Sequence, residues 1–137
     1  STEWEVLRDR EYLWIQKKDS IQLIPELIIE EIERTPSFVI PRDKHIACLD
    51  ADKLNHPLTI RKWERGDKFI PLGMNGKKKV SDYLTDKKFS LFQKENQYVV
   101  CSGEDIVWLV NERSDHRYRI TDSTQRILLI QIKKDGQ

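Results

Sequence analysis

Residues 61–84 read RKWERGDKFIPLGMNGKKKVSDYL, a run that combines strong turn signals with the densest positive charge of the chain. The pattern predicts a strand ending in a basic pair and then a tight turn at Gly66-Asp67, because glycine adopts positive φ without steric cost. Beyond the turn we expect an apolar clamp, followed by a flexible loop that leads into three lysines. The clamp consists of Phe69, Pro71, Leu72 and Met74.

A helix is expected directly after this loop. Val80, Tyr83 and Leu84 fall at helical spacing. Their spacing predicts a helix of roughly ten residues that begins close to Lys78 or Val80. A second, short helical turn is expected over residues 90–95.

The lysines at 77–79 stand at the expected helix start, where they oppose the helix dipole. They therefore do not serve helix stability. An incoming phosphate would be attracted both by the ammonium groups and by the outward-pointing backbone N–H groups at the helix start. Asp82 and Asp86 are expected to offset part of this charge, by pairing with Lys78 or Lys79.

Short strands account for most of the remaining chain. Residues 126–132 are apolar on both faces, which predicts a central strand. Residues 98–101 and 106–110 flank a turn at 102–104 and predict a hairpin. Residues 27–29 fit a strand at least as well as an amphipathic helix. Further strands are expected at 38–40, 46–49, 58–63 and 118–120, and a hairpin at 4–15.

The chain has 137 residues, of which 38% are hydrophobic, with 24 Lys and Arg against 23 Asp and Glu. This composition predicts one soluble globular domain over residues 1–137. The element pattern predicts the α+β class, rich in strands, with one main helix after the loop that contains Gly66, Gly73 and Gly76, called the glycine loop below. The formal charge of +1 hides a segregation, because residues 1–57 sum to −4, residues 58–94 to +6 and residues 95–137 to −1. Local patches set the field that a large anion meets, so the basic middle is compatible with a nucleic-acid partner.

The N-terminus indicates a cytoplasmic location and no membrane association. The chain begins at Ser1 without an initiator methionine or a signal sequence. Nothing approaches the roughly 18 consecutive apolar residues that a membrane-spanning helix needs. We therefore expect a cytoplasmic protein that was cut from a longer chain.

No catalytic or metal-binding constellation is recognisable. The segment 73–78 lacks the glycine spacing and the Ser or Thr of a phosphate-binding P-loop. Residues 114–116 contain the residue types of a catalytic triad, but neighbours on one loop cannot form its hydrogen-bonded relay. The histidines and cysteines lack metal-ligand spacing, and we expect the two cysteines to be reduced, half-buried strand residues. These are His45, His56, His116, Cys48 and Cys101.

The run from 61 to 84 resembles the C-terminal, substrate-binding domain of bacterial tRNA(Ile)-lysidine synthases. The resemblance rests on an arginine, a tryptophan, Gly-Asp-Lys-Phe, a proline, Gly-Met, a lysine run and Ser-Asp, all in order. The segment from 106 to 120, which ends in Arg-Tyr-Arg-Ile, matches the closing Trp, Arg, Asp and Arg-Phe-Arg-Val elements of that domain. Specific matching covers residues 58–120, whereas residues 1–57 agree only in general layout.

This resemblance implies a fold related to a domain of the phenylalanyl-tRNA synthetase β chain. It also implies a parent ligase that uses ATP and Mg²⁺ to attach lysine to C2 of the wobble cytidine of an isoleucine tRNA. In that family the chemistry belongs to an N-terminal ATP-pyrophosphatase-type domain, so this chain is expected to be non-catalytic. Its implied partners are the tRNA acceptor stem and the catalytic domain of the same chain, and a homodimer of the parent is left open.

Eight basic residues are the candidate phosphate contacts when the family pattern is carried across position by position. The aromatic residues and the proline of the pattern are expected to be core rather than base-stacking platforms. Asn111 departs from a family glycine but tolerates positive φ, while Ser90 and Lys94 replace a frequent proline and arginine. The candidate contacts are Arg61, Arg65, Lys68, Lys77, Lys78, Lys79, Arg113 and Arg117.

Two alternatives remain beside tRNA binding. In the first, the basic face docks on an acidic surface of the parent chain or of a partner protein, without contacting RNA. In the second, the domain edits charged tRNA by hydrolysis, by analogy with the related synthetase domain. The absence of a recognisable nucleophile, base or metal set argues against this second alternative.

Overall fold

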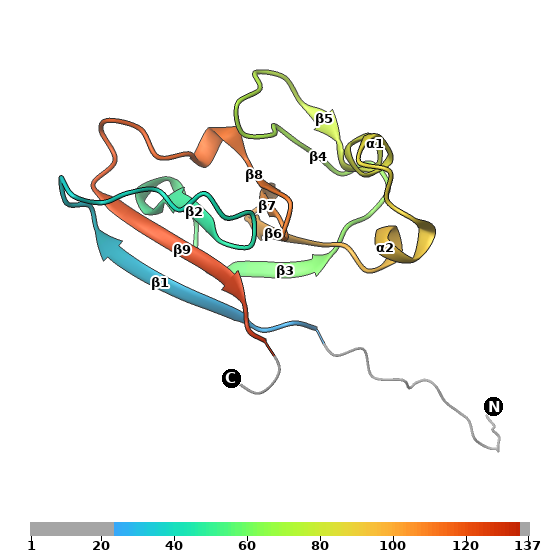
Figure 1. Cartoon of the computed structure of the whole chain (residues 1–137), viewed down its shortest axis with the longest axis horizontal. Helices are drawn as coiled ribbons and strands as arrows, with labels where there is room; N and C mark the ends of the chain where they lie inside the picture. Colours follow the sequence, from blue (N-terminus) through green and yellow to red (C-terminus); the bar gives the residue numbers. More distant parts are fainter. Residues whose placement is uncertain (1–23, 135–137) are drawn as a thin grey trace, which may run out of the picture.

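A computed structural model of the chain describes residues 24–134 (Figure 1). The hairpin expected at residues 4–15 lies outside the described residues. Two sheets and a small ribbon make up the fold. The first sheet has the order β1-β9-β2, formed by Leu27–Glu33, Arg126–Ile132 and Ala47–Asp50. The second has the order β3-β6-β7-β8, formed by Leu58–Lys62, Tyr98–Ser102, Asp105–Leu109 and Arg113–Ser114.

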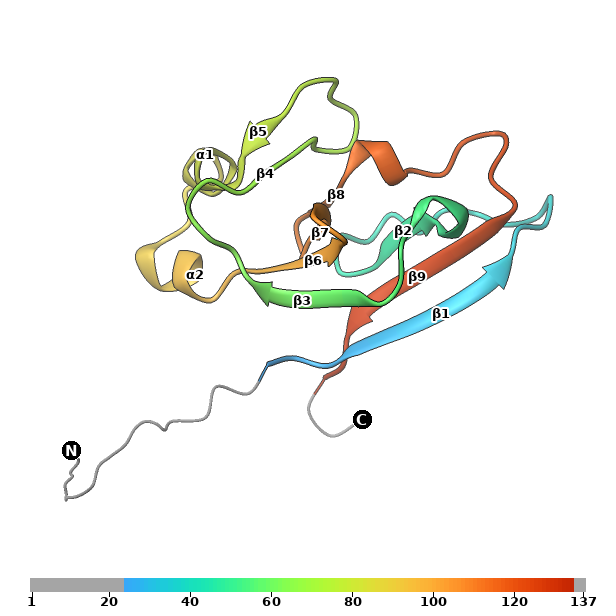
Figure 2. The ribbon, with the colours of Figure 1, turned by 180° about the vertical axis from the view of Figure 1, so that it is seen from behind.

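The ribbon and the helices occupy the side of the molecule away from β1, in both views of the ribbon drawing (Figures 1 and 2). The ribbon pairs β4 with β5, and two short helices follow it in the chain. Single 3₁₀ turns lie at Ala51–Lys53 and His116–Tyr118. The elements at this end are β4 (Lys68–Phe69), β5 (Lys78–Lys79), α1 (Val80–Asp86) and α2 (Leu91–Glu95).

The last strand, β9, is central, as its two apolar faces predicted. It pairs antiparallel with β1 on one edge and with β2 on the other, so that Ile130 lies opposite both Ile29 and Ala47. Ile127, Leu128 and Ile130 are buried. Strand partners on both edges make β9 the central strand, and burial of side chains from both of its faces agrees with its apolar pattern.

The predicted β6–β7 hairpin is confirmed, and it separates two hydrophobic clusters. Val100 and Trp108 pack into a cluster with β2 and β9. Val99 and Leu109 pack into a second cluster, with β4 and α1. Alternate side chains of a strand point to opposite faces, and this alternation lets one hairpin anchor the ribbon end to the central sheet. The strands expected at 46–49 and 58–63, and the strand alternative for residues 27–29, are also confirmed.

Two expected strands do not form. Residues 38–40 lie in a loop, where the Phe38 N–H donates to the Thr35 carbonyl in a turn. Prolines at 36 and 41 bracket this run and remove backbone donors that a ladder would need. Residues 118–120 begin instead in a 3₁₀ turn, because the Asp115 side chain caps it by accepting from the Arg117 N–H. Residues 38–40 therefore do not form a strand because they have no partner strand, and residues 118–120 do not because the Asp115 cap favours the 3₁₀ turn.

The main helix begins at Val80 as predicted but ends after seven residues rather than ten. Its end is a Schellman motif, in which Lys88 adopts a φ of 62°. The Phe89 N–H donates to the Leu84 carbonyl and the Lys88 N–H donates to the Thr85 carbonyl, the two bonds that define this cap. Phe89 then packs against the second cluster, so a hydrophobic contact closes the helix early.

The connection that follows is well defined despite its departures from the family pattern. Ser90 caps α2 by accepting from the Gln93 N–H, while the Gln93 side chain accepts from the Ser90 N–H. This capping box confirms the expected second helical turn. Asn111 adopts a φ of 62°, as its tolerance of positive φ predicted. In the part of the chain that the structure describes, no helix is long and apolar enough to span a membrane.

Candidate nucleic-acid interface

The β4–β5 ribbon carries the basic residues of the glycine loop. Lys68 lies opposite Lys79 and Phe69 lies opposite Lys78 in its antiparallel register. Directly opposed residues of a ribbon share a face. Phe69 is fully buried and packs its ring edge-on against Tyr83 at a centroid distance of 5.6 Å. Lys68 and Lys79 therefore stand on the outer face, whereas Lys78 shares the inner face with Phe69.

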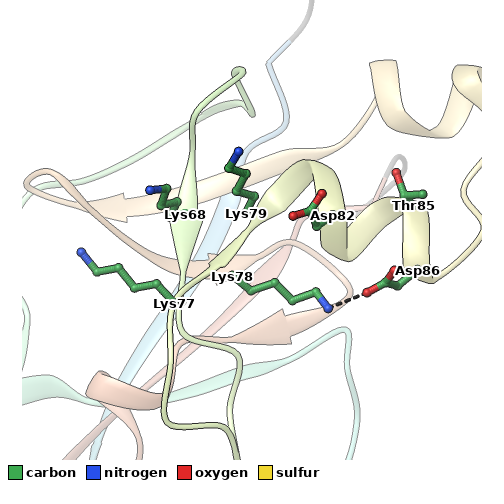
Figure 3. Close-up of a pocket in the computed structure, with 7 residues that line it drawn as sticks. All are labelled: Lys68, Lys77, Lys78, Lys79, Asp82, Thr85 and Asp86. Carbon is green, nitrogen blue, oxygen red and sulfur yellow. Dashed lines mark hydrogen bonds and ion pairs between the residues drawn. The ribbon is translucent and has the colours of Figure 1, made fainter.

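A pocket of about 530 Å³ lies between this ribbon and α1. Figure 3 shows the Lys78 side chain reaching toward the helix, with its Nζ 2.5 Å from Asp86 Oδ2, while Lys77 points the opposite way. Among residues 24–134, Lys68, Lys77 and Lys79 have no ion-pair partner. The pocket is lined by Lys68, Lys77, Lys78, Lys79, Asp82, Thr85 and Asp86.

The structure corrects how the lysines are presented. They do not begin the helix: Lys78 and Lys79 form β5, and Lys79 is the N-cap residue of α1 without a side-chain cap bond. The first helical N–H, of Val80, donates to the Asp67 carbonyl at 2.9 Å. Asp86 rather than Asp82 forms the ion pair with Lys78, because the Lys78 side chain runs along the helix toward Asp86 (Figure 3). The positive charge therefore belongs to a ribbon surface and not to a helix terminus.

Arg61 forms an ion pair with Asp67 in the turn at the base of the ribbon. Its Nη1 and Nη2 atoms donate to the two carboxylate oxygens of Asp67 at 2.8 and 3.0 Å. Asp67 also accepts from the Glu64 N–H at 2.7 Å. Burial works to raise the pKa of Asp67, but these hydrogen bonds outweigh it and leave the pKa below its ordinary value. Arg65, two residues before Asp67, is exposed.

Arg117 forms an ion pair with a second carboxylate, that of Asp115, which is completely buried. Its Nε and Nη2 atoms donate to Asp115 at 3.0 Å each, and these hydrogen bonds raise the pKa of the guanidinium. The same carboxylate accepts from the Ile70 N–H at 2.9 Å. Asp115 thereby ties the glycine loop to the 3₁₀ turn.

Backbone contacts continue this attachment. The His116 N–H donates to the Ile70 carbonyl at 2.7 Å, and the Leu72 N–H donates to the Ser114 carbonyl at 3.0 Å. The Gly73 N–H donates to His116 Nδ1 at 3.1 Å. The sequence interpretation missed Asp115 and His116 as residues that position the loop. The sequence offered one signal, an Asp at a position where it could cap a short turn. Residue types alone do not reveal that Asp115 also binds the backbone of Ile70, 45 residues earlier.

The predicted contacts therefore fall into three groups. Lys68, Lys77, Lys78 and Lys79 meet around one pocket. Arg61 and Arg117 are ion-paired at the base of the loop, while Arg65 and Arg113 are exposed and lie outside the pocket.

The apolar members of the motif lie largely in the core, as expected. Phe69, Pro71 and Trp108 are buried. Trp63 is half-buried, and its indole N–H donates to the Lys94 carbonyl at 2.6 Å. The clamp prediction was wrong for Leu72 and Met74, which are 40% and 43% exposed. The loop beyond Pro71 is held by backbone hydrogen bonds, such as the one from the Leu72 N–H to the Ser114 carbonyl, and not by burial of these two side chains.

The described residues contain no group arranged to hold a metal ion. Within residues 24–134, no group of three or more His, Cys, Asp and Glu side chains is arranged to hold a metal ion. Both cysteines are free strand residues; Cys48 is half-buried and Cys101 fully buried. Burial raises the pKa of Cys48 to about 11, which keeps it a thiol at neutral pH. That ATP and Mg²⁺ act elsewhere in a parent enzyme stays a prediction.

The fold places the chain in a known class of α+β domain. It superposes on the TilS C-terminal domain with a TM-score of 0.67 and 20% identity, covering 81% of this chain and 85% of that one. It also matches an N-terminal fragment of the phenylalanyl-tRNA synthetase β-subunit from Pyrococcus horikoshii, with a TM-score of 0.56 and 18% identity over 64% of this chain and 27% of that one. The predicted α+β class and its two structural relatives are confirmed. No model of a protein family matches the chain.

Two curated sequence relatives carry one and the same name. The chain is 54% identical over 135 residues to tRNA(Ile)-lysidine synthase of Bacteroides thetaiotaomicron, covering 96% of this chain and 32% of that protein. It is 45% identical to the enzyme of the same name from Parabacteroides distasonis, covering 95% and 33%. The chain thus spans about a third of the length of these curated relatives. The predicted resemblance to the C-terminal domain of tRNA(Ile)-lysidine synthase is confirmed.

Proposed function

We propose that this chain is the tRNA-binding C-terminal module of a tRNA(Ile)-lysidine synthase, and that it binds the acceptor stem. The observation that carries the proposal is a ribbon with three lysines, Lys68, Lys77 and Lys79, that have no ion-pair partner among the described residues. The ribbon is fixed at its base by the Arg61–Asp67 and Arg117–Asp115 pairs. Exposed ammonium groups on a ribbon that is fixed at its base suit the phosphates of a nucleic-acid backbone.

The parent enzyme, in this proposal, is an ATP-dependent ligase of the cytoplasm. ATP, Mg²⁺ and lysine act in its N-terminal catalytic domain, and this module contributes binding without catalysis. Its partners are the tRNA and that catalytic domain, and the parent can assemble as a homodimer without changing this role. By holding the acceptor stem, the module places the distant anticodon loop in the active site of the other domain.

Contacts to duplex phosphates fix the register of a protein on RNA but carry little sequence information. The deep, narrow major groove of A-form RNA is closed to side chains, so lysines on a ribbon reach the backbone rather than base edges. Selectivity for the isoleucine tRNA should therefore reside mostly outside the lysine surface.

The four lysines and four arginines have different roles in this proposal. Lys68, Lys77 and Lys79 contact phosphates directly, and Lys78 can join them by leaving Asp86. Arg61 and Arg117 position the ribbon through their carboxylate partners. Arg65 and Arg113 extend the contact surface on either side of the loop.

The proposal is tested by measuring the Kd of the chain for an acceptor-stem minihelix at several salt concentrations. The plot of log affinity against log salt should fall with a slope of about 0.9 per phosphate contact, as for duplex DNA. Changing Lys68, Lys77 and Lys79 together to Ala should weaken binding and make that slope less steep by about 2.7.

A matched control replaces Lys53, Lys133 and Lys134 by Ala, which changes the net charge equally but away from the ribbon. This control should retain most of the affinity. A flat salt dependence, or equal losses in the two triple variants, would refute the assignment of the ribbon. If tRNA has no effect while adding the remainder of the parent chain raises the Tm, the module docks on protein instead. Deacylation of charged tRNA by the chain would point to editing.

A further inference from the structure

A second pocket, of about 490 Å³, opens where the glycine loop meets the central sheet. One of its walls is the loop that carries the apolar run at 38–40, and another is Leu72 of the glycine loop. Its lining combines apolar and charged side chains. The residues that matter here are Ile40, Leu72, Trp108, Arg42, Lys44 and Arg113.

The apolar part of this pocket is partly open to water. Trp108 is buried, with 1% of its surface exposed, whereas Ile40 is 46% and Leu72 is 40% exposed. Neither of these two side chains is needed to close the hydrophobic clusters, to which they do not contribute. Exposed apolar surface within a concave site favours a ligand with a flat or apolar face.

Two arginines in the lining of this pocket, Arg42 and Arg113, are available to bind an anion. Lys44 Nζ lies 3.6 Å from Glu112 Oε2. Asp43 accepts hydrogen bonds from the His45 N–H and lies 3.0 Å from the His45 ring. In contrast, neither Arg42 nor Arg113 has an ion-pair partner within residues 24–134. Guanidinium groups bind phosphate through paired donors and also stack on bases.

The pocket and the lysine ribbon are connected through the same loop. The Leu72 N–H donates to the carbonyl of Ser114, the residue after Arg113, at 3.0 Å. Lys77 follows Leu72 by five residues in the same loop. This connection is compatible with a duplex that lies on the ribbon and presents its end to the pocket.

We propose that this pocket binds an unpaired nucleotide that extends from the end of the bound RNA duplex. Its base lies against Ile40 and Leu72, and its phosphate is held by Arg42 and Arg113. An acceptor stem ends in unpaired 3′ nucleotides, which supply both the apolar face and the charge. This inference rests on the proposed function and adds a site for the single-stranded end.

The test compares a blunt acceptor-stem minihelix with one that carries an unpaired four-nucleotide 3′ extension, by the Kd of each for the chain. The extension should tighten binding about tenfold, as expected for one well-held base. Ile40→Glu and Leu72→Glu, which place a carboxylate in the pocket, should each abolish this gain. Val39→Glu is the matched control, because Val39 is 80% exposed, adjoins Ile40 and does not line the pocket.

The outcomes separate this inference from the proposed function. If the blunt minihelix binds but the extension gives the wild type no gain, as it would if a protein segment filled the pocket, the inference fails and acceptor-stem binding stands. A gain that survives in both pocket variants also overturns the inference. If the blunt minihelix does not bind with a salt-dependent Kd, the proposed function itself fails. Thermal unfolding of each variant confirms that the fold is retained.

Discussion

Two sets of positive charges lie around the β4–β5 ribbon, and their surroundings differ. At the base, Arg61 and Arg117 form two hydrogen bonds each with a carboxylate, and one of those carboxylates, Asp115, is completely buried. On the ribbon, Lys68 and Lys79 are exposed. The candidate basic residues therefore include charges that hold the loop in place and charges that remain available to a ligand.

The choice of residue type explains this division. Arginine has a planar fork that matches a carboxylate with two parallel bonds, so it suits a fixed, partly desolvated site. Lysine is a strongly hydrated point charge on a flexible stem, so it suits a solvated surface that meets phosphates. A basic motif is thus better divided by side-chain chemistry than counted as one patch.

The largest effect is expected when Asp115 is changed to Ala. This change leaves the Ile70 N–H without its acceptor and removes the buried partner of Arg117, which keeps Asp105 at 3.4 Å. It should lower the free energy of unfolding by about 2–4 kcal/mol. Urea denaturation measures the loss. Asp115→Asn, which keeps the shape and one acceptor oxygen, should cost less. A loss under about 1 kcal/mol for Asp115→Ala would mean that the loop is not held by this carboxylate.

A smaller effect is expected at the Arg61–Asp67 pair. Asp67→Asn should lower the free energy of unfolding by about 1–2 kcal/mol at pH 7, because the pair is partly exposed and screened. The pKa of Asp67 is lowered in the folded state, so its contribution is complete above its unfolded pKa of about 4 and is lost as the pH falls through the folded pKa.

The gap in unfolding free energy between the wild type and Asp67→Asn should therefore narrow when denaturation is repeated below about pH 4. Asp82→Asn serves as the control, since Asp82 is exposed and forms no hydrogen bond or ion pair within the described residues. A gap that stays constant with pH would show that the Asp67 charge does not contribute.

The smallest effect on stability is expected at the one ribbon lysine that is paired. Asp86→Asn should change the free energy of unfolding by less than about 1 kcal/mol, because the ion pair with Lys78 is exposed. It should nevertheless tighten minihelix binding, since Lys78 is released to the RNA. Asp82→Asn removes the same charge from the pocket without releasing Lys78, so the difference in Kd between these two variants reports Lys78 alone. Equal Kd values would place Lys78 outside the interface.

Much of the fold could be predicted where local rules and tertiary contacts agree. The helix start at Val80, the short helical turn at residues 90–95 and the central position of residues 126–132 were predicted from spacing and from two apolar faces. Residues 38–40 had the composition of a strand but found no partner. Helix length was also overestimated, because the Schellman cap depends on Phe89 reaching the second cluster, a contact that local spacing does not reveal.

The candidate site was predicted in part, and for a related reason. The sequence located the basic motif, but it assigned Lys77, Lys78 and Lys79 to a helix terminus and treated Arg61 and Arg117 like the lysines. The register of Lys68 opposite Lys79 and the reach of Asp115 to Ile70 join positions far apart in the chain. Such pairings depend on which backbone groups are left without partners after the sheets form.

The amino-acid sequence by itself determined the strand-rich α+β class, the two helical segments, the core role of most of the motif's aromatics and the resemblance to tRNA(Ile)-lysidine synthase. These depend on periodicity, caps and a long ordered motif, all of which are local. Only the tertiary structure decided which charges are paired and which face solvent. The reason is physical: a charge is neutralised by whatever carboxylate the fold brings within hydrogen-bond distance, and sequence separation does not limit that distance.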